Sequence, residues 1–197
     1  RNASTNAYIS CSPLLLPPSP DHVFRNDQGR FVDVTAAAGF VDPGGRGLGV
    51  LTAQLDEDMK IDVFVANDMT ANLMFQNKGG FRFEESGQAA GVASNADGGF
   101  RAGMGVGSGD IDGDGRLDLV VTNFYGEGLS LYQNMGGLFF VERGRESGLA
   151  QASRYRLGFG VAFLDADNDG LPDLISANGH LDDLGDVPYK MPLQFFH

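Results

Sequence analysis

An internal repeat is the feature that most constrains how this chain folds. Three segments, starting at residues 47, 103 and 158, align without a gap and read GLGVLTAQLDEDMKIDVFVAND, GMGVGSGDIDGDGRLDLVVTNF and GFGVAFLDADNDGLPDLISANG. The positions with identical residues include Gly49, Gly105 and Gly160; Asp62, Asp118 and Asp173; Asn67, Asn123 and Asn178. The asparagines are 56 and 55 residues apart. A fixed period of this kind is typical of folds that stack one supersecondary unit on the next.

A second repeated block lies between these segments. It reads VFRNDQGRFVDVTAAAGF, MFQNKGGFRFEESGQAAGV and LYQNMGGLFFVERGRESGL, and it aligns Phe31, Phe83 and Phe140, each with a glycine eight residues later. Asn- and Gly-rich turns separate two short apolar runs in each copy, which is the signal of a β-hairpin. Each unit therefore predicts four short strands, which in the second unit are expected at 105–109, 117–122, 131–132 and 139–141.

Four strands in each repeat are typical of propeller blades. We therefore expect an all-β fold, a β-propeller segment of about three four-stranded blades that is partial or open. Helical patterning is weak, and residues 35–39 are expected to make one turn at most. Because propellers have ~4–8 blades, a shorter segment leaves sheet edges exposed. We expect the remaining blades or another protein chain to cover these edges.

The repeat divides the chain into five parts. Residues 1–21 form a Pro- and Ser-rich lead-in, which we interpret as the tail of a preceding repeat. Residues 22–72, 73–129 and 130–190 are expected to be repeats 1, 2 and 3, and residues 191–197 the start of a further repeat. The last assignment depends on the pair Phe196-His197, which is in register with Phe75-Gln76.

Two acidic loops carry the chemistry that the sequence predicts. Both have the pattern D-x-D-x-D-G-x-x-D, which places four carboxylates within nine residues. Such carboxylates repel one another unless a cation neutralises them, and calcium accepts about six to eight oxygen ligands with loose geometry. The expected ligands are Asp110, Asp112, Asp114, Arg116 (backbone O) and Asp118 in repeat 2, and Asp165, Asp167, Asp169, Leu171 (backbone O) and Asp173 in repeat 3.

Other interpretations of these loops fit less well. An EF-hand has Glu at position 12 and flanking helices, whereas Val121 and Ser176 stand there within strand-like sequence. Zinc is disfavoured because no Cys or His accompanies the carboxylates in the motif, and magnesium because it keeps more water ligands. Metal-free Asp-Gly turns are the remaining alternative, although two complete copies at homologous places argue against a chance origin.

The corresponding loop of repeat 1 departs from the pattern. It offers Gln54, Asp56, Asp58 and Asp62, with Met59 in place of the glycine and Lys60 beside it. A Gln oxygen can ligate, but a left-handed turn is unfavourable for Met, and the lysine adds a positive charge. The loop is thus either a degenerate metal site or a vestigial turn held by hydrogen bonds. We expect Ca2+ at two sites, with the third left open.

Composition narrows the classes of partner. The net charge of −12 disfavours binding to nucleic acid and to anionic membranes. One cysteine, Cys11, excludes an internal disulfide, and its role is left open. No run of 18 apolar residues is present, so we expect no membrane span.

No catalytic residue is predicted. The run at 103–109 does not match G-x-G-x-x-G because Ser108 stands at the last glycine position. His180 precedes Asp182 and Asp183, and its two readings are a metal or catalytic residue and, as we favour, a hydrogen-bonded turn histidine. Asn2-Ala3-Ser4 is an N-glycosylation sequon, which matters only in a eukaryotic secretory setting.

The loops and their flanking strands resemble FG-GAP repeats, also called VCBS repeats. GFGV at 158–161 corresponds to the FG part and LISANG at 174–179 to the GAP part. Over residues 11–197 the sequence is similar to the ASPIC/UnbV group, relatives of cartilage acidic protein. The stretches that carry this similarity include PDHVFRNDQGRFVDVTAAAGF and SANGHLDD. The resemblance implies an integrin-α-like propeller with calcium in loops at one rim. It also implies export and a scaffold or interaction role.

The sequence therefore leads to one favoured function and two alternatives. We expect a calcium-binding, non-catalytic scaffold or protein/glycan interaction module that is secreted, periplasmic or at the cell surface, where calcium sites of ~10⁻⁴–10⁻³ M affinity are useful. The first alternative is an accessory non-catalytic subunit or domain of a larger cell-envelope, membrane-associated or enzyme complex. The second is a hydrolase or lyase that uses the calcium directly, which is disfavoured because carboxylate-filled loops leave no open metal position.

Overall fold

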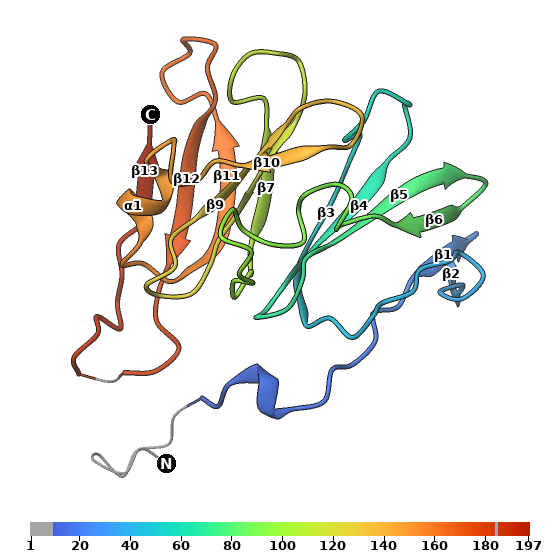
Figure 1. The fold of residues 1–197 in the computed structure, drawn as a ribbon, viewed down its shortest axis with the longest axis horizontal. Helices are drawn as coiled ribbons and strands as arrows, with labels where there is room; N and C mark the ends of the chain where they lie inside the picture. The colour runs from blue at the N-terminus through green and yellow to red at the C-terminus, as the bar shows by residue number, and fades with distance from the viewer. Residues whose placement is uncertain (1–9, 184) are drawn as a thin grey trace.

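The computed structural model describes residues 10–183 and 185–197. The sequon at residues 2–4 lies outside the described residues. The chain forms small antiparallel sheets that lie side by side (Figure 1). The strands are β1 (Phe24–Asp27), β2 (Arg30–Asp33), β3 (Gly47–Ala53), β4 (Asp62–Asn67), β5 (Leu73–Gly79), β6 (Arg82–Glu85), β7 (Val106–Gly109), β8 (Asp118–Val121), β9 (Ser130–Asn134), β10 (Phe140–Glu142), β11 (Gly158–Leu164), β12 (Asp173–Asn178) and β13 (Gln194–Phe196). A 3-10 turn at Pro13–Leu15 and the helix α1 at Leu149–Ser153 complete the described elements.

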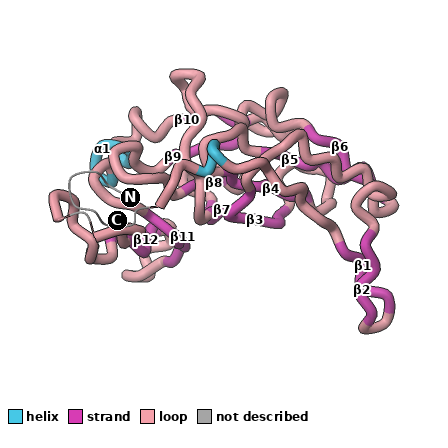
Figure 2. The backbone as a smooth tube through the Cα atoms, turned by 90° about the horizontal axis from the view of Figure 1, so that it is seen from below, coloured by secondary structure: helices cyan, strands magenta, loops and turns pink. Residues whose placement is uncertain are grey.

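The sheets have the strand order of propeller blades. Strands β3-β4-β5-β6 and β7-β8-β9-β10 each form a four-stranded meander, β11-β12-β13 forms a three-stranded sheet, and β1-β2 forms a hairpin. The all-β, propeller-like class predicted from the repeat is therefore confirmed. The four strands expected in the second unit are β7 to β10, with bounds that differ by only a few residues. Figure 2 shows the β1–β2 hairpin projecting away from the other sheets.

The sheets are offset from the sequence units. β3 and β4 precede residue 72 while β5 and β6 follow it, and the same holds for the pairs on either side of residue 129. The boundaries at 72/73 and 129/130 thus separate units of sequence and not sheets. β13 pairs with β12 as the third strand of its sheet, with Phe196 opposite Leu174. In the first sheet Phe75 lies opposite Val63 in the same way.

The second strand of each four-stranded sheet is buried on both faces. In β4, Phe64 and Ala66 contribute to a core shared with the β7–β10 sheet, whereas Val65 packs on the opposite side against Phe40 and Phe75. Successive strand residues point to opposite faces, so burial on both sides requires a continuous apolar run. This is why VFVA and LVV show no alternation of polar and apolar residues.

The sheets stack through their first strands. β3 packs against β7, and β7 packs against β11. Glycine permits this close approach, since a Cβ added to Gly105 would lie 2.3 Å from the carbonyl oxygen of Phe159. The corresponding Cβ at Gly49 would lie 2.0 Å from the oxygen of Met104. Gly49 and Gly105 therefore mark the contacts between neighbouring sheets.

Candidate metal centres

The three acidic loops occupy equivalent places in the fold. Each joins the first strand of its sheet to the second: residues 54–61 between β3 and β4, 110–117 between β7 and β8, and 165–172 between β11 and β12. Because the sheets stand side by side in the same orientation, the loops lie along one edge of the molecule, the upper edge in Figure 1. This shared rim is the candidate metal-binding region.

Backbone N–H groups organise the loop of repeat 2 around Asp110. Its Oδ1 accepts a hydrogen bond from the N–H of Gly113 at 2.9 Å, and its Oδ2 accepts one from Gly115 at 2.9 Å. Gly113 and Gly115 have φ of 76° and 86°, a left-handed conformation that glycine adopts at little cost. The loop is thus coiled tightly around the first carboxylate of the motif.

Asp118 closes this loop from the buried start of β8. Its side chain is shielded, with 1% of the residue exposed. The carboxylate accepts the N–H of Ile111 at 3.0 Å and the N–H of Asn134 at 2.8 Å. Burial raises the pKa of Asp118 above its ordinary value, and the nearby charges of Asp112 and Asp114 act in the same direction. A bound cation would relieve both effects.

The loop of repeat 2 brings three of its predicted carboxylates together. Oxygens of Asp110, Asp112 and Asp118 lie within 4.8 Å of one another. Asp114 is not part of this group, because it forms an ion pair with the guanidinium of Arg116. The same guanidinium donates through Nε to the carbonyl oxygen of Asn134 at 3.0 Å. The guanidinium of Arg116 would therefore compete with a metal ion for Asp114, one of the expected ligands.

The loop of repeat 3 is more open to a cation. Oxygens of Asp165, Asp167 and Asp169 lie within 4.8 Å of one another, and all three residues are exposed. Asp165 Oδ2 accepts a hydrogen bond from the N–H of Gly170 at 3.1 Å, as Asp110 Oδ2 does from the N–H of Gly115. The position of Arg116 is taken by the uncharged Leu171. The acids of this loop therefore lack the competing cation found in repeat 2.

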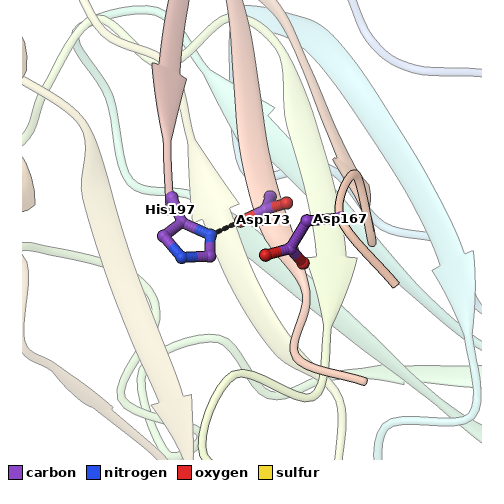
Figure 3. Close-up of side chains that lie close together, drawn as sticks. All are labelled: Asp167, Asp173 and His197. Carbon is purple, nitrogen blue, oxygen red and sulfur yellow. Dashed lines mark hydrogen bonds and ion pairs between the residues drawn. The ribbon is translucent and has the colours of Figure 1, made fainter. Parts of the chain in front are cut away.

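Asp173 belongs to a different group in repeat 3. It is buried, with 4% exposed, and it gathers with Asp167 and His197. Its Oδ2 accepts the N–H of Ala166 at 2.9 Å, and this bond, followed by the bond to His197, lowers the pKa of Asp173. A histidine therefore lies beside the carboxylates of repeat 3 in the folded chain (Figure 3). The imidazole comes from the neighbouring strand and not from the motif.

The degenerate loop of repeat 1 has internal partners for its acids. Lys60 Nζ lies 2.5 Å from Asp58 Oδ2, and this hydrogen bond lowers the pKa of Asp58. Asp56 Oδ2 accepts a hydrogen bond from Gln76 Nε2 at 2.9 Å. Within the described part of the chain, Asp56, Asp58 and Asp62 do not converge as the acids of the other loops do. The arrangement fits a vestigial loop held by hydrogen bonds better than a metal site.

Met59 corrects one expectation about this loop. It adopts φ of 62°, so it takes the left-handed turn that is unfavourable for a residue with a Cβ. A left-handed residue with a Cβ costs about 1–2 kcal/mol. The degeneracy of the loop therefore lies in its charges and not in its backbone path.

Three residues on the third strands were missed by the motif analysis. Gln76 and Gln133 donate through Nε2 to the position-3 acids Asp56 and Asp112, at 2.9 and 2.5 Å. His197 occupies the same register position, and its Nδ1 lies 2.8 Å from Asp173 Oδ1. The register of Phe196-His197 with Phe75-Gln76 was the only sequence signal for this role, because the strand pairing that brings them to the loops is not local.

His180 lies away from these loops. It follows the far end of β12, about 20 Å from Asp173 along the strand, and it is buried. Its ring makes edge-to-face contacts with Phe124 and Tyr125 at centroid distances of 5.5 and 6.1 Å. The N–H of Asp182 donates to Nδ1 at 3.2 Å. These contacts support the interpretation of a hydrogen-bonded turn histidine.

The donor chemistry of the two complete loops fits a hard divalent cation. Carboxylate oxygens converge from a turn whose N–H groups hold the outer acids in place, and calcium is the ion that such oxygen sets suit. The loops would supply Asp110, Asp112 and Asp118 in repeat 2, and Asp165, Asp167 and Asp169 in repeat 3. Bound calcium would supply charge compensation, tying the first and second strands of each sheet together.

Stacked four-stranded sheets with an acidic loop between their first and second strands define a propeller-like repeat protein. The sequence profile of the family described as FG-GAP-like repeat matches residues 54–121 and, in a second copy, residues 110–176. Together the matches extend over more than half of the chain, and the chain belongs to the FG-GAP-like repeat family. A search of curated proteins found no match. In the described part of the chain, none of the helices has the length and apolar character needed to cross a membrane.

Proposed function

We propose that this protein is a calcium-binding FG-GAP module of the ASPIC/UnbV group that acts as a non-catalytic scaffold or protein/glycan interaction domain outside the cytoplasm. The observation that carries the proposal is the convergence of three carboxylates in each of two homologous loops on one rim. FG-GAP repeats are in general interaction modules, which supports the non-catalytic role. Secretion, a periplasmic location or display at the cell surface would supply the calcium that weak extracellular sites need.

Calcium has a structural role in this proposal. Two ions would change the net charge of −12 to about −8, since each adds two positive charges. They would also offset the cost of the buried carboxylate of Asp118, whose pKa is raised by burial. Because each loop connects the first and second strands of a sheet, neutralising its charge would stabilise the sheet and fix the rim that a partner meets.

The partner is proposed to cover the open faces of the sheet stack. Leu48 and Val50 on β3 are 61% and 67% exposed, and they border a cavity of about 440 Å³ beside the first sheet. At the other end a Cβ on Gly160 would meet only Ala177 at 3.8 Å, where the equivalent glycines meet a neighbouring sheet. Because large contiguous apolar surfaces mark interaction sites, we propose that Leu48 and Val50 belong to such a surface. The remaining blades or another protein chain would fill it.

An accessory role in a larger assembly is the second candidate. The same uncovered face favours it, because a subunit held within a cell-envelope, membrane-associated or enzyme complex would bury this surface permanently. Isolation of the protein with a second polypeptide on its β3 face would support this alternative over a free-standing module.

A thermal melt with EDTA and with millimolar calcium tests the calcium sites. Calcium at 100 times its dissociation constant adds ~2.7 kcal/mol per site, which for a chain of this size raises the Tm by roughly 5–10 °C. The double variant Asp112→Ala/Asp167→Ala should lose most of this rise. Asp183→Ala, which removes an exposed acid outside the loops, is the matched control and should keep it. A folded wild-type protein without a calcium-dependent rise would refute the metal assignment.

A further inference from the structure

The side chain at position 7 of the acidic loops, counted from Asp110 in repeat 2, differs between the three repeats. It is Lys60 in repeat 1, Arg116 in repeat 2 and Leu171 in repeat 3. Only the backbone oxygen of this position is an expected metal ligand, so the motif leaves the side chain free to vary. The three loops therefore form a comparison within one molecule, in which the charge of one side chain changes beside similar sets of acids.

A charged side chain at position 7 pairs with the acid at position 5 of its own loop. Lys60 Nζ lies 2.5 Å from Asp58 Oδ2 in repeat 1. The guanidinium of Arg116 forms the equivalent ion pair with Asp114 in repeat 2. Two loops of different sequence thus make the same contact, which follows from the two-residue spacing and not from one local accident.

The convergence of the acids follows this pairing. In repeat 3, where position 7 is uncharged, the acid at position 5 belongs to the converging group, because oxygens of Asp165, Asp167 and Asp169 lie within 4.8 Å of one another. In repeat 2 the converging group leaves out Asp114, which Arg116 holds. The acid at position 5 is therefore available to a metal ion in repeat 3 and already paired in repeat 2.

The second sheet holds the side chain of Arg116 beside its loop. Nε of Arg116 donates a hydrogen bond to the backbone oxygen of Asn134 at 3.0 Å. Asn134 is buried, with 1% exposed, and its side-chain amide donates to the backbone oxygens of Leu55 and Leu117 at 2.9 and 3.1 Å. The guanidinium is thus tied to a buried part of the sheet, which keeps its positive charge close to the carboxylates.

We propose that the side chain at position 7 sets the order in which the loops take up calcium, so that Arg116 makes the repeat 2 loop the weaker site and the repeat 3 loop fills first. Binding in repeat 2 has to break the pair between Asp114 and the guanidinium, and it brings a divalent ion close to a fixed positive charge. Both effects oppose binding. Neither effect operates at Leu171, which is uncharged and 60% exposed. The inference rests on the proposed function, because it ranks the two proposed calcium loops.

Each loop can be measured alone in the full chain. Asp167→Ala disables the repeat 3 loop and leaves repeat 2, whereas Asp112→Ala does the reverse. In the first background Arg116→Leu gives repeat 2 the residue of repeat 3, and in the second Leu171→Arg gives repeat 3 the residue of repeat 2. Arg116→Lys is the matched control, because it keeps the positive charge, as Lys60 does in repeat 1. Calorimetric titration of Ca2+ into the metal-free proteins gives the Kd of each loop.

We expect the repeat 3 loop to have the lower Kd of the two. Arg116→Leu should lower the Kd of the repeat 2 loop by about three- to tenfold, and Leu171→Arg should raise that of the repeat 3 loop by a similar factor. Arg116→Lys should leave the Kd of repeat 2 close to its original value. Added NaCl should reduce these differences, because salt screens the charge at position 7.

An unchanged Kd in either reciprocal variant would overturn the proposal. A Kd in Arg116→Lys that equals the Kd in Arg116→Leu would also overturn it, because the effect would then come from the hydrogen bond to Asn134 and not from the charge. Absence of Ca2+ binding by both isolated loops would instead refute the calcium function itself. The failure of the ranking and the failure of the calcium function are therefore distinguishable.

Discussion

Replacing Gly105 with Ala should destabilise the protein because of the close contact between neighbouring sheets. The new Cβ would lie 2.3 Å from the carbonyl oxygen of Phe159, roughly 1 Å closer than atoms pack without repulsion. The obstacle is backbone, so relief requires the β7 and β11 strands to separate. Overpacking of this kind costs about 1–3 kcal/mol, which corresponds to a fall in Tm of roughly 2–12 °C for a chain of this length.

The repeat supplies a matched control for this substitution. Gly160 occupies the same position in the third repeat, but a Cβ there would meet only Ala177 at 3.8 Å. Gly160→Ala should therefore leave the free energy of unfolding unchanged or raise it by ~0.4–1 kcal/mol through the unfolded state. Gly49→Ala, whose Cβ would lie 2.0 Å from the oxygen of Met104, should behave like Gly105→Ala.

Urea denaturation of the three variants in EDTA measures these differences without the contribution of metal. Equal destabilisation by Gly160→Ala and Gly105→Ala would refute the reasoning, because the cost would then come from the strand itself and not from the neighbouring sheet. A neutral Gly105→Ala would refute the stacking of first strands.

Three further predictions concern titration, a buried hydroxyl and a loop backbone. In EDTA, the wild-type protein should gain stability relative to the double variant Asp62→Asn/Asp118→Asn as the pH is lowered, because burial raises the pKa values of Asp62 and Asp118 in the folded state, which takes up protons before the unfolded state does; a difference between the two proteins that does not change with pH in urea denaturation would contradict this. Tyr132→Phe should cost roughly 1–2 kcal/mol, since the buried hydroxyl bonds Asn95 Oδ1 at 3.1 Å, whereas the exposed Tyr155→Phe should be neutral in the same assay. Met59→Gly should raise stability by roughly 0.5–1 kcal/mol because φ is 62° there; an unchanged or lower urea midpoint would show that Met59 is not strained.

The repeat by itself determined the strand plan and the location of the acidic loops. Aligned glycines and aspartates fixed where each sheet begins and where its second strand starts, because burial on both faces leaves a recognisable apolar run such as LVV in β8. The position of Asp118 in the motif likewise indicated a closing ligand, and the structure places it buried at the start of that strand.

Only the tertiary structure decided which acids converge and what else meets them. Asp114 forms an ion pair with Arg116, and Asp58 forms one with Lys60. His197, on the third strand, lies within hydrogen-bond distance of Asp173. Arg116 and Lys60 belong to the nine-residue loops and pair with an acid two residues away, whereas the contact of His197 does not follow from the motif, because it depends on strand register that the loop does not encode. The loop pattern is local and can be read along the chain, whereas the contacts of the third strands with the loops form only when the chain folds, because they join residues far apart in the sequence.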